Sequence, residues 1–275
     1  MAAISKIGIL GLGKMGAPMA RHLLSRGYSV AGYDPLEPAR NHARALGVTV
    51  LGSPCEVART SELVIVVVGF DQEVEATLFG ANGVVESAPR GLVVALASTV
   101  APRYARRLAE RLRELGVVLL DIPLARGEAA AVAGKLLIYG AGDEAVFEAC
   151  RPAFGAFASD IFHLGAAGAG QVGKMVNNLI LWSCIVANDE GLALGEALGV
   201  ERARLQAALH HGSAQNWAMD HGAERSGMPW AEKDMSIVLH EADLARVSLP
   251  LSGTVKETIK GLKIRLGLGM PPGAE

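Results

Sequence analysis

The sequence of 275 residues predicts an α/β fold: a doubly wound parallel sheet, followed by a long interdomain helix and an all-helical C-terminal domain. Three observations lead to this prediction. Short apolar runs alternate with helical patterns over residues 1–165, which is typical of a parallel sheet with right-handed crossovers. A glycine-rich turn follows the first apolar run. After Gly165 the pattern is helical to the end.

The predicted strands are short and rich in Val, Ile and Leu, as expected for strands that are buried on both faces. They cover residues 6–10, 29–33, 63–68, 92–97, 117–122, 135–139 and 160–164. A single helix is expected from 167 to about 198, and helical segments are expected after it. The predicted domain boundaries are therefore 1–165 and 166–275.

Composition excludes several classes of partner. The formal net charge is -2, from 26 Lys+Arg and 28 Asp+Glu, so the basic face that nucleic acid requires is not expected. No uncharged apolar run reaches the ~18 residues of a membrane-spanning helix. Cys55, Cys150 and Cys184 are far apart, which predicts neither a disulfide framework nor a zinc site. We expect a cytoplasmic protein with no bound metal.

The segment Gly11-Leu12-Gly13-Lys14-Met15-Gly16 follows a buried strand and opens a helix. In such a motif the first glycine allows a tight turn, the second lets backbone N–H groups approach a pyrophosphate, and the third permits close packing of helix and strand. The positive end of the helix also attracts phosphate. The segment therefore predicts a dinucleotide site in domain 1–165.

Asp34 ends the next predicted strand, 18 residues after Gly16. Its carboxylate is placed to accept both hydroxyls of the adenosine ribose and to repel a 2′-phosphate. Pro35, not an arginine, follows it, so we predict NAD as cofactor in preference to NADP. The alternative is a structural glycine turn with a capping or solvated aspartate. The combination of strand, glycines, helix and Asp34 disfavours that alternative.

A second glycine-rich segment, from Gly168 to Asn178, opens the long helix. Lys174 and Asn178 are four residues apart and share one helix face. In general, burial lowers the pKa of a lysine and suits it to proton transfer near neutral pH. The alternative is a lysine that extends from an apolar helix to solvent. Three glycines here each cost roughly 1 kcal/mol relative to alanine, which indicates that some group approaches the backbone closely.

With these segments the sequence resembles the β-hydroxyacid dehydrogenase family, whose members include 3-hydroxyisobutyrate dehydrogenase and tartronate semialdehyde reductase. The resemblance runs nearly end to end. It is carried by residues 11–20, Ser98-Thr99-Val100, Asp121-Ile122-Pro123, the Gly168–Asn178 segment and Lys233-Asp234-Met235. It implies a Rossmann-type dinucleotide-binding domain at 1–165, a helical substrate and dimerisation domain at 166–275, and a homodimer or homotetramer.

The resemblance also implies roles for individual residues. Lys174 would act as general acid/base on the substrate hydroxyl while hydride passes to or from the nicotinamide. Asn178 would hold the substrate. The remaining substrate residues would be Ser98, Ala125, Arg126 and Gly127, and the cofactor residues would be Gly11, Leu12, Gly13, Met15, Gly16, Asp34, Val68, Gly69, Thr99 and Lys233.

Two segments depart from the family pattern. Val68-Gly69 stands where relatives usually have Leu-Pro, and Leu124-Ala125-Arg126-Gly127 replaces a usual Val-Ser-Gly-Gly. A similar arginine is found in members that resemble sulfolactaldehyde reductase. The planar guanidinium of Arg126 suits a carboxylate, sulfonate or phosphate, so it is a candidate ligand for an acidic substrate. An exposed arginine paired with Glu128 explains the sequence equally well.

The function predicted from these residues is that of a NAD-dependent oxidoreductase that interconverts a small 3-hydroxy acid and its semialdehyde. One alternative is an imine or enone reductase on the same scaffold. Such relatives commonly replace the lysine that matches Lys174, which argues against it. The other alternative is a non-catalytic NAD(H)-binding module.

Overall fold

The computed structural model describes residues 4–220 and 228–269. The chain divides into two compact units, one up to Lys174 and the other from Met175 onward. This division falls inside the long helix, whereas the sequence placed the domain boundary before it.

The first unit contains a six-stranded sheet. Its strands are β1 (Lys6–Leu10), β2 (Ser29–Tyr33), β3 (Thr49–Val50), β4 (Leu63–Val66), β5 (Val93–Leu96) and β6 (Val118–Asp121). They lie in the order β3-β2-β1-β4-β5-β6, and all neighbours are parallel. This order, which reverses between β1 and β4, confirms the predicted doubly wound fold. Ligands of such sheets bind beyond the carboxyl ends of the strands near that reversal.

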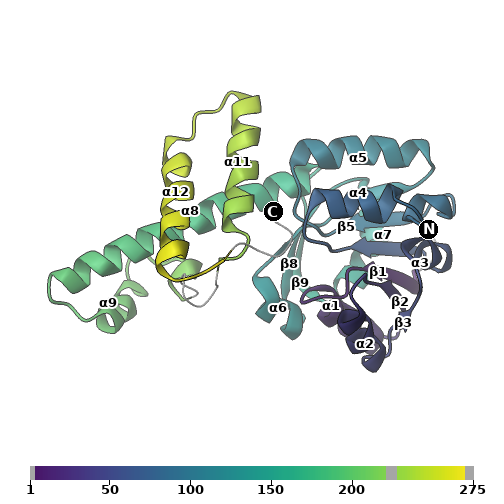
Figure 1. The fold of residues 1–275 in the computed structure, drawn as a ribbon, viewed down its shortest axis with the longest axis horizontal. Helices are drawn as coiled ribbons and strands as arrows, with labels where there is room; N and C mark the ends of the chain where they lie inside the picture. Colours follow the sequence, from purple (N-terminus) through teal and green to yellow (C-terminus); the bar gives the residue numbers. More distant parts are fainter. Residues whose placement is uncertain (1–3, 221–227, 270–275) are drawn as a thin grey trace. The chain divides into compact units, whose positions relative to one another are not determined.

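Helices cover both faces of this sheet. They are α1 (Gly16–Ser25), α2 (Glu37–Ala45), α3 (Pro54–Thr60), α4 (Asp71–Phe79) and α5 (Pro102–Glu114), with a short 3₁₀ helix η1 (Val84–Glu86). Figure 1 shows α4 and α5 along one face and α1 and α2 along the other. Separate apolar clusters fill the two interfaces. Because both faces are packed, every residue of β4 and β5 is buried, as their apolar sequences predict.

A smaller sheet completes the first unit. It consists of β7 (Leu124–Ala125), β8 (Leu136–Gly140) and β9 (Ala158–His163), in that order, with β7 antiparallel to β8 and β8 parallel to β9. Helix α6 (Gly127–Ala133) connects β7 to β8, and helix α7 (Glu144–Phe154) connects β8 to β9. β8 and β9 match the last two predicted strands. The sequence missed β3 and β7, because two-residue strands are too short to produce a pattern.

The described part of the second unit is helical. Helix α8 (Ala169–Ala197) confirms the predicted long helix and passes from the first unit into the second. It is followed by α9 (Arg202–Leu209), a 3₁₀ helix η2 (Trp217–Met219), α11 (Ala231–Ala245) and α12 (Pro250–Arg265). Trp182 and Ile185 of α8 share one apolar cluster with Met235 of α11 and Ile259 of α12. None of the described helices is long and apolar enough to cross a membrane.

Candidate active site

The glycine turn lies at the carboxyl end of β1. Gly11 has φ +97°, and a Cβ at this position would overlap the carbonyl oxygen of Val67. A Cβ at Gly16 would overlap the carbonyl oxygen of Gly11. Both glycines are therefore required by the fold itself, the first for its left-handed backbone and the second for close packing.

Gly13 is different. Its φ lies outside the left-handed region, and a Cβ there would meet no other described atom within 4 Å, its chain neighbours aside. The fold does not require glycine at this position. The open space over Gly13, at a helix N-terminus, is what a bound pyrophosphate needs in order to approach backbone N–H groups. The residues present therefore fit a dinucleotide.

Asp34 is 7% exposed and is oriented by two backbone N–H groups. Its Oδ2 accepts from Leu12 N at 2.8 Å and its Oδ1 accepts from Leu36 N at 2.8 Å. Each carboxylate oxygen can accept a further hydrogen bond. The carboxylate thus ties the end of β2 to the glycine turn and still has acceptor capacity for ribose hydroxyls.

An arginine that was not predicted as a site residue lies beside Asp34. Arg40 Nη1 donates to the carbonyl oxygens of Asp34 at 2.7 Å and of Pro35 at 2.9 Å. The same guanidinium pairs with Glu37, and this pair lowers the pKa of the Glu37 carboxyl. Arg40 therefore supports the turn that carries Asp34. Six residues separate them in sequence, so the absence of an arginine directly after Asp34 gave no indication of it.

The loops after β4 and β5 are joined by a side chain. Ser98 is 3% exposed, and its Oγ accepts from Val68 N at 2.9 Å. The hydroxyl of Ser98 is buried and holds the neighbouring loop, and its substrate role stays a prediction. Thr99, by contrast, is partly exposed. Val68, Gly69 and Thr99 thus lie at the carboxyl ends of adjacent strands, as a cofactor-binding role requires.

The glycines at the start of α8 serve contacts within the protein. A Cβ at Gly170 would overlap the carbonyl oxygen of Tyr139 and lie 2.7 Å from Asp121 Oδ2, and one at Gly173 would lie 2.5 Å from Leu164 Cδ1. The close approach inferred from the sequence is therefore made by the protein itself. These close contacts let the first turns of α8 pack against residues of both sheets.

The start of α8 is capped by a buried carboxylate. Asp121, the last residue of β6, is fully buried, and it accepts from Gly168 N at 3.0 Å and from Gln171 N at 2.9 Å. Burial raises the pKa of Asp121, and these backbone hydrogen bonds oppose the shift. Asp121 and Gln171 are 50 residues apart in sequence, so no local pattern predicted this contact.

Lys174 is partly buried in α8 and stands one helical turn before Asn178. Asn178 is 3% exposed, and its Nδ2 donates to Asp234 Oδ2 at 2.8 Å. Trp182 Nε1 donates to the same oxygen at 3.3 Å. Asp234 thereby fixes the amide of Asn178, a role that was not predicted because the two residues are 56 positions apart in sequence.

Lys233, the last predicted cofactor residue, lies in the first turn of α11 beside Asp234. Its Nζ lies 5.5 Å from the centre of the Trp230 ring, within the range of a cation–π contact. Lys233 and Asn178 therefore belong to the second unit, while the other predicted cofactor and substrate residues belong to the first.

The loop between β7 and α6 contains the departure from the family pattern. Arg126 has φ +81° and Gly127 has φ +73°, so Arg126 adopts a backbone conformation that favours glycine. Arg126 Nη1 donates to Asp160 Oδ2 at 2.5 Å and to Ser159 Oγ at 3.0 Å. Hydrogen bonds from these two side chains lower the pKa of Asp160.

The partner of Arg126 in the structure is Asp160, not Glu128, which was the alternative that the sequence left open. Glu128 pairs instead with Lys14 of the glycine turn, at 3.3 Å. The guanidinium of Arg126 lies instead against β9, which contains Ser159 and Asp160. Ala125, the neighbouring predicted residue, is 5% exposed and pairs with Leu137 of β8; its substrate role stays a prediction.

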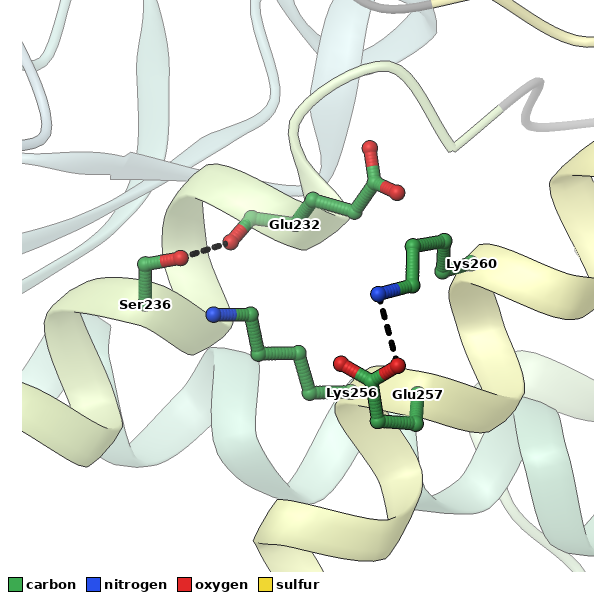
Figure 2. A pocket seen from close by; sticks show the side chains of 5 residues that line it. All are labelled: Glu232, Ser236, Lys256, Glu257 and Lys260. Carbon is green, nitrogen blue, oxygen red and sulfur yellow. Dashed lines mark hydrogen bonds and ion pairs between the residues drawn. The ribbon is translucent and has the colours of Figure 1, made fainter.

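A surface pocket of about 320 Å³ lies on α11 and α12, and none of the predicted site residues lines it (Figure 2). Its charges are largely paired: Lys260 Nζ lies 2.6 Å from Glu257 Oε2, and Glu232 Oε2 accepts from Lys263 Nζ at 3.1 Å. Ser236 Oγ donates to the Glu232 carbonyl oxygen at 2.7 Å. Nothing in this arrangement suits hydride transfer. Within residues 4–220 and 228–269, no group of three His, Cys, Asp or Glu side chains could hold a metal ion.

Comparison with known proteins relates both parts of the chain to dehydrogenases. Residues 6–165 match the family described as the NAD binding domain of 6-phosphogluconate dehydrogenase. Residues 168–269 match the family described as the NAD-binding domain of NADP-dependent 3-hydroxyisobutyrate dehydrogenase.

Individual proteins that are similar to this chain are also dehydrogenases. A NAD-dependent L-serine dehydrogenase of Pseudomonas aeruginosa is 36% identical over 79% of this chain and 73% of its own. A 2-(hydroxymethyl)glutarate dehydrogenase of Eubacterium barkeri is 31% identical over 96% of this chain and 91% of its own. The structure of Mycobacterium tuberculosis 3-hydroxyisobutyrate dehydrogenase with L-serine superposes with a TM-score of 0.87 at 26% identity, covering 95% of this chain and 94% of that one.

Proposed function

Because this chain belongs to the β-hydroxyacid dehydrogenase family of NAD(P)-binding oxidoreductases, we propose that it interconverts a small 3-hydroxy acid and its semialdehyde. The observation that carries the proposal is the combination of two features. Gly13 leaves open space at a phosphate-binding turn, and Lys174 shares a helix face with the oriented amide of Asn178.

In the proposed reaction a bound nicotinamide accepts or returns the hydride. Lys174 acts as the general acid/base. In oxidation its amine takes the proton of the substrate hydroxyl as the C–H hydride leaves, and in reduction its ammonium gives a proton to the carbonyl oxygen. Asn178 binds the substrate through an amide that Asp234 holds in one orientation. Pre-oriented groups of this kind lower the cost of organising the transition state.

The proposed cofactor is NAD in preference to NADP. Both oxygens of the Asp34 carboxylate are fixed by backbone N–H groups, so the negative charge stands in place before the nucleotide binds. A 2′-phosphate would meet that charge. Arg40, the nearby cation, is already engaged by Glu37 and by backbone carbonyls.

The substrate is proposed to be acidic. The relatives act on L-serine and 2-(hydroxymethyl)glutarate according to their names, and both molecules carry a hydroxymethyl group next to the carbon that bears a carboxylate. Arg126 remains a candidate for binding a second acidic group, although a ligand would have to compete with Asp160 for Nη1. The homodimer or homotetramer and the cytoplasmic location also remain predictions.

The decisive experiment measures NADH binding and turnover separately. The parent protein is screened with L-serine, 3-hydroxyisobutyrate, 2-(hydroxymethyl)glutarate and cyclic imines, and the screen is repeated with Lys174→Ala. We expect turnover of a hydroxy acid by the parent and a loss in kcat of about 100-fold or more in the variant, with NADH affinity retained. Lys135→Ala, an exposed lysine, is the matched control and should behave as the parent does.

Two results would contradict the proposal. Tight NADH binding without turnover of any hydroxy acid would indicate a binding module. Reduction of imines, with Lys174→Ala fully active, would indicate the alternative reductase.

A further inference from the structure

The buried side chain of Gln171, in the first turn of α8, forms hydrogen bonds with the backbone on both sides of Thr99, a predicted cofactor residue. Gln171 is 1% exposed. Its Nε2 donates to the carbonyl oxygen of Ser98 at 3.0 Å, and its Oε1 accepts from Val100 N at 3.1 Å. Thr99 lies between these two backbone groups. A carboxamide can donate and accept at once, so one side chain holds the backbone on both sides of Thr99.

The position of Gln171 is itself fixed from the sheet. Its backbone N–H donates to Asp121 Oδ2, and Gly168 N donates to the other oxygen of the same carboxylate. Asp121 ends β6 and is fully buried. The first turn of α8 is therefore anchored to the carboxyl end of β6, and Gln171 extends from that anchor to the loop after β5.

The same hydrogen bonds continue to β4. Ser98, whose carbonyl oxygen accepts from Gln171, uses its Oγ to accept from Val68 N. The ends of three neighbouring parallel strands, β4, β5 and β6, are thus joined at the edge where such sheets bind ligands. Lys174 follows Gln171 by three residues, a spacing that places both on the same side of the helix.

We propose that Gln171 is a positioning residue for the hydride-transfer reaction: it sets the Thr99 loop at a fixed place relative to the helix that carries Lys174. The inference rests on the proposed function, because the roles of Thr99 and Lys174 belong to it. Both polar atoms of the Gln171 side chain are engaged by backbone groups of the protein. Its effect passes through the backbone of Thr99 and through the first turns of α8.

The test compares Gln171→Leu and Gln171→Glu with the parent and with Gln72→Leu. Leucine removes both side-chain hydrogen bonds. Glutamate keeps an acceptor for Val100 N but loses the donor to the Ser98 carbonyl. Gln72 is exposed on α4, so its replacement by leucine is the matched control. Each protein is measured for amide hydrogen exchange without cofactor, for NADH Kd by fluorescence, and for kcat and KM.

In Gln171→Leu the amides of Val100 and Val68 should exchange about tenfold faster than in the parent, since a buried hydrogen bond of ordinary strength is lost. NADH Kd should rise about tenfold and kcat should fall by at least as much. Gln171→Glu should retain protection of the Val100 amide and show the same direction of change in Kd and kcat. Gln72→Leu should match the parent in every measurement.

A purely structural role would give a different pattern. If both Gln171 variants melted at lower temperature but kept the parent's NADH Kd and kcat, the proposal would be wrong. Should Gln171→Leu fail to fold, Gln171→Glu decides by the same two readouts. Failure of the proposed function is recognised separately, by a parent that turns over no hydroxy acid. Even then, weaker NADH binding in Gln171→Glu would support the positioning role, and unchanged binding would overturn it.

Discussion

Two glycines of one motif have different reasons to be glycine. Gly16 is required by packing, since a Cβ would overlap the carbonyl oxygen of Gly11. Gly13 is not required by any described neighbour. A sequence motif cannot separate these reasons, because the residue type is the same at both positions. The distinction leads to opposite expectations for the two alanine variants.

Gly13→Ala should fold with a melting temperature within about 2 °C of the parent, because the added methyl group meets open space and surface substitutions of this kind change stability little. NADH binding should weaken at least tenfold, since the methyl group fills the space that a pyrophosphate needs. Calorimetry and fluorescence titration provide the two measurements.

Gly16→Ala is the contrasting control. It should lower the free energy of unfolding by more than about 1 kcal/mol through overpacking. A Gly13→Ala protein that binds NADH as tightly as the parent would show that the open space is not the cofactor site.

Arg126 occupies a backbone position that is unfavourable for any residue with a Cβ. At φ +81° a non-glycine residue costs about 1–2 kcal/mol. The family resemblance implies glycine at this position, and the observed backbone conformation is one that favours glycine. Hydrogen bonds of the guanidinium to Asp160 and Ser159 of β9, and to the carbonyl oxygen of Lys135 just before β8, offset this cost.

Arg126→Gly and Arg126→Ala separate strain from contact. Both remove the guanidinium, but only glycine relieves the backbone, so Arg126→Gly should be more stable than Arg126→Ala by about 1 kcal/mol in urea unfolding. Equal stabilities would mean that position 126 relaxes to a negative φ once the contacts of the arginine are gone. For substrate binding, a rise in KM for 2-(hydroxymethyl)glutarate that is absent for L-serine would support a role of Arg126 with a second carboxylate.

At the scale of elements, an ion pair links α4 to α5. Arg111 donates to both oxygens of Glu75, at 2.6 and 3.1 Å, and its guanidinium lies 3.9 Å from the centre of the Phe79 ring. The hydrogen bond from Arg111 lowers the pKa of Glu75 below the ordinary value of 4.5, against the opposing effect of burial. The folded state therefore binds a proton at this carboxyl less readily than the unfolded chain does.

The consequence is a pH-dependent contribution to stability. A depressed pKa stabilises the fold above the unfolded value and loses that effect as the pH falls through the folded value. Glu75→Gln should therefore melt below the parent at pH 7, and the gap should close as the pH falls below about 4.5. Both side chains are substantially exposed, so the gap should be small and should shrink in high salt. A gap that widens in acid would contradict the assignment.

The sequence predicted most of the strands and the long helix α8 well. The buried strands and the long helix produce strong periodic patterns, because a strand packed on both faces must be apolar throughout. The glycines of α8 were harder to interpret. Their close neighbours, among them Tyr139 and Leu164, come from segments that are distant in sequence, so the pattern indicated a close approach without indicating to what.

At the scale of the whole molecule, all the predicted cofactor residues except Lys233 lie in the first unit. NADH at 100 times its Kd should therefore stabilise the folded first unit by about 2.7 kcal/mol, by mass action. Calorimetry measures this as a rise in the melting temperature of the first unit. Lys174→Ala should show the same stabilisation because it retains cofactor binding. Stabilisation confined to a transition of the second unit would contradict the assignment of the glycine turn as the main cofactor site.

The sequence by itself determined the doubly wound sheet, the dinucleotide-binding turn and the candidate pair of Lys174 and Asn178. These features are local: periodicity, turn chemistry and the four-residue spacing of a helix are all written in neighbouring residues. The family resemblance added roles, and the comparisons support the same family.

The tertiary structure decided which partners fix those residues. Asp234 orients Asn178, Gln171 brackets Thr99, and Asp160 rather than Glu128 pairs with Arg126. Each of these hydrogen bonds joins residues more than thirty positions apart in sequence. Buried polar groups must find partners wherever the fold brings donors and acceptors together, and no local pattern in the chain specifies which distant residue will be there.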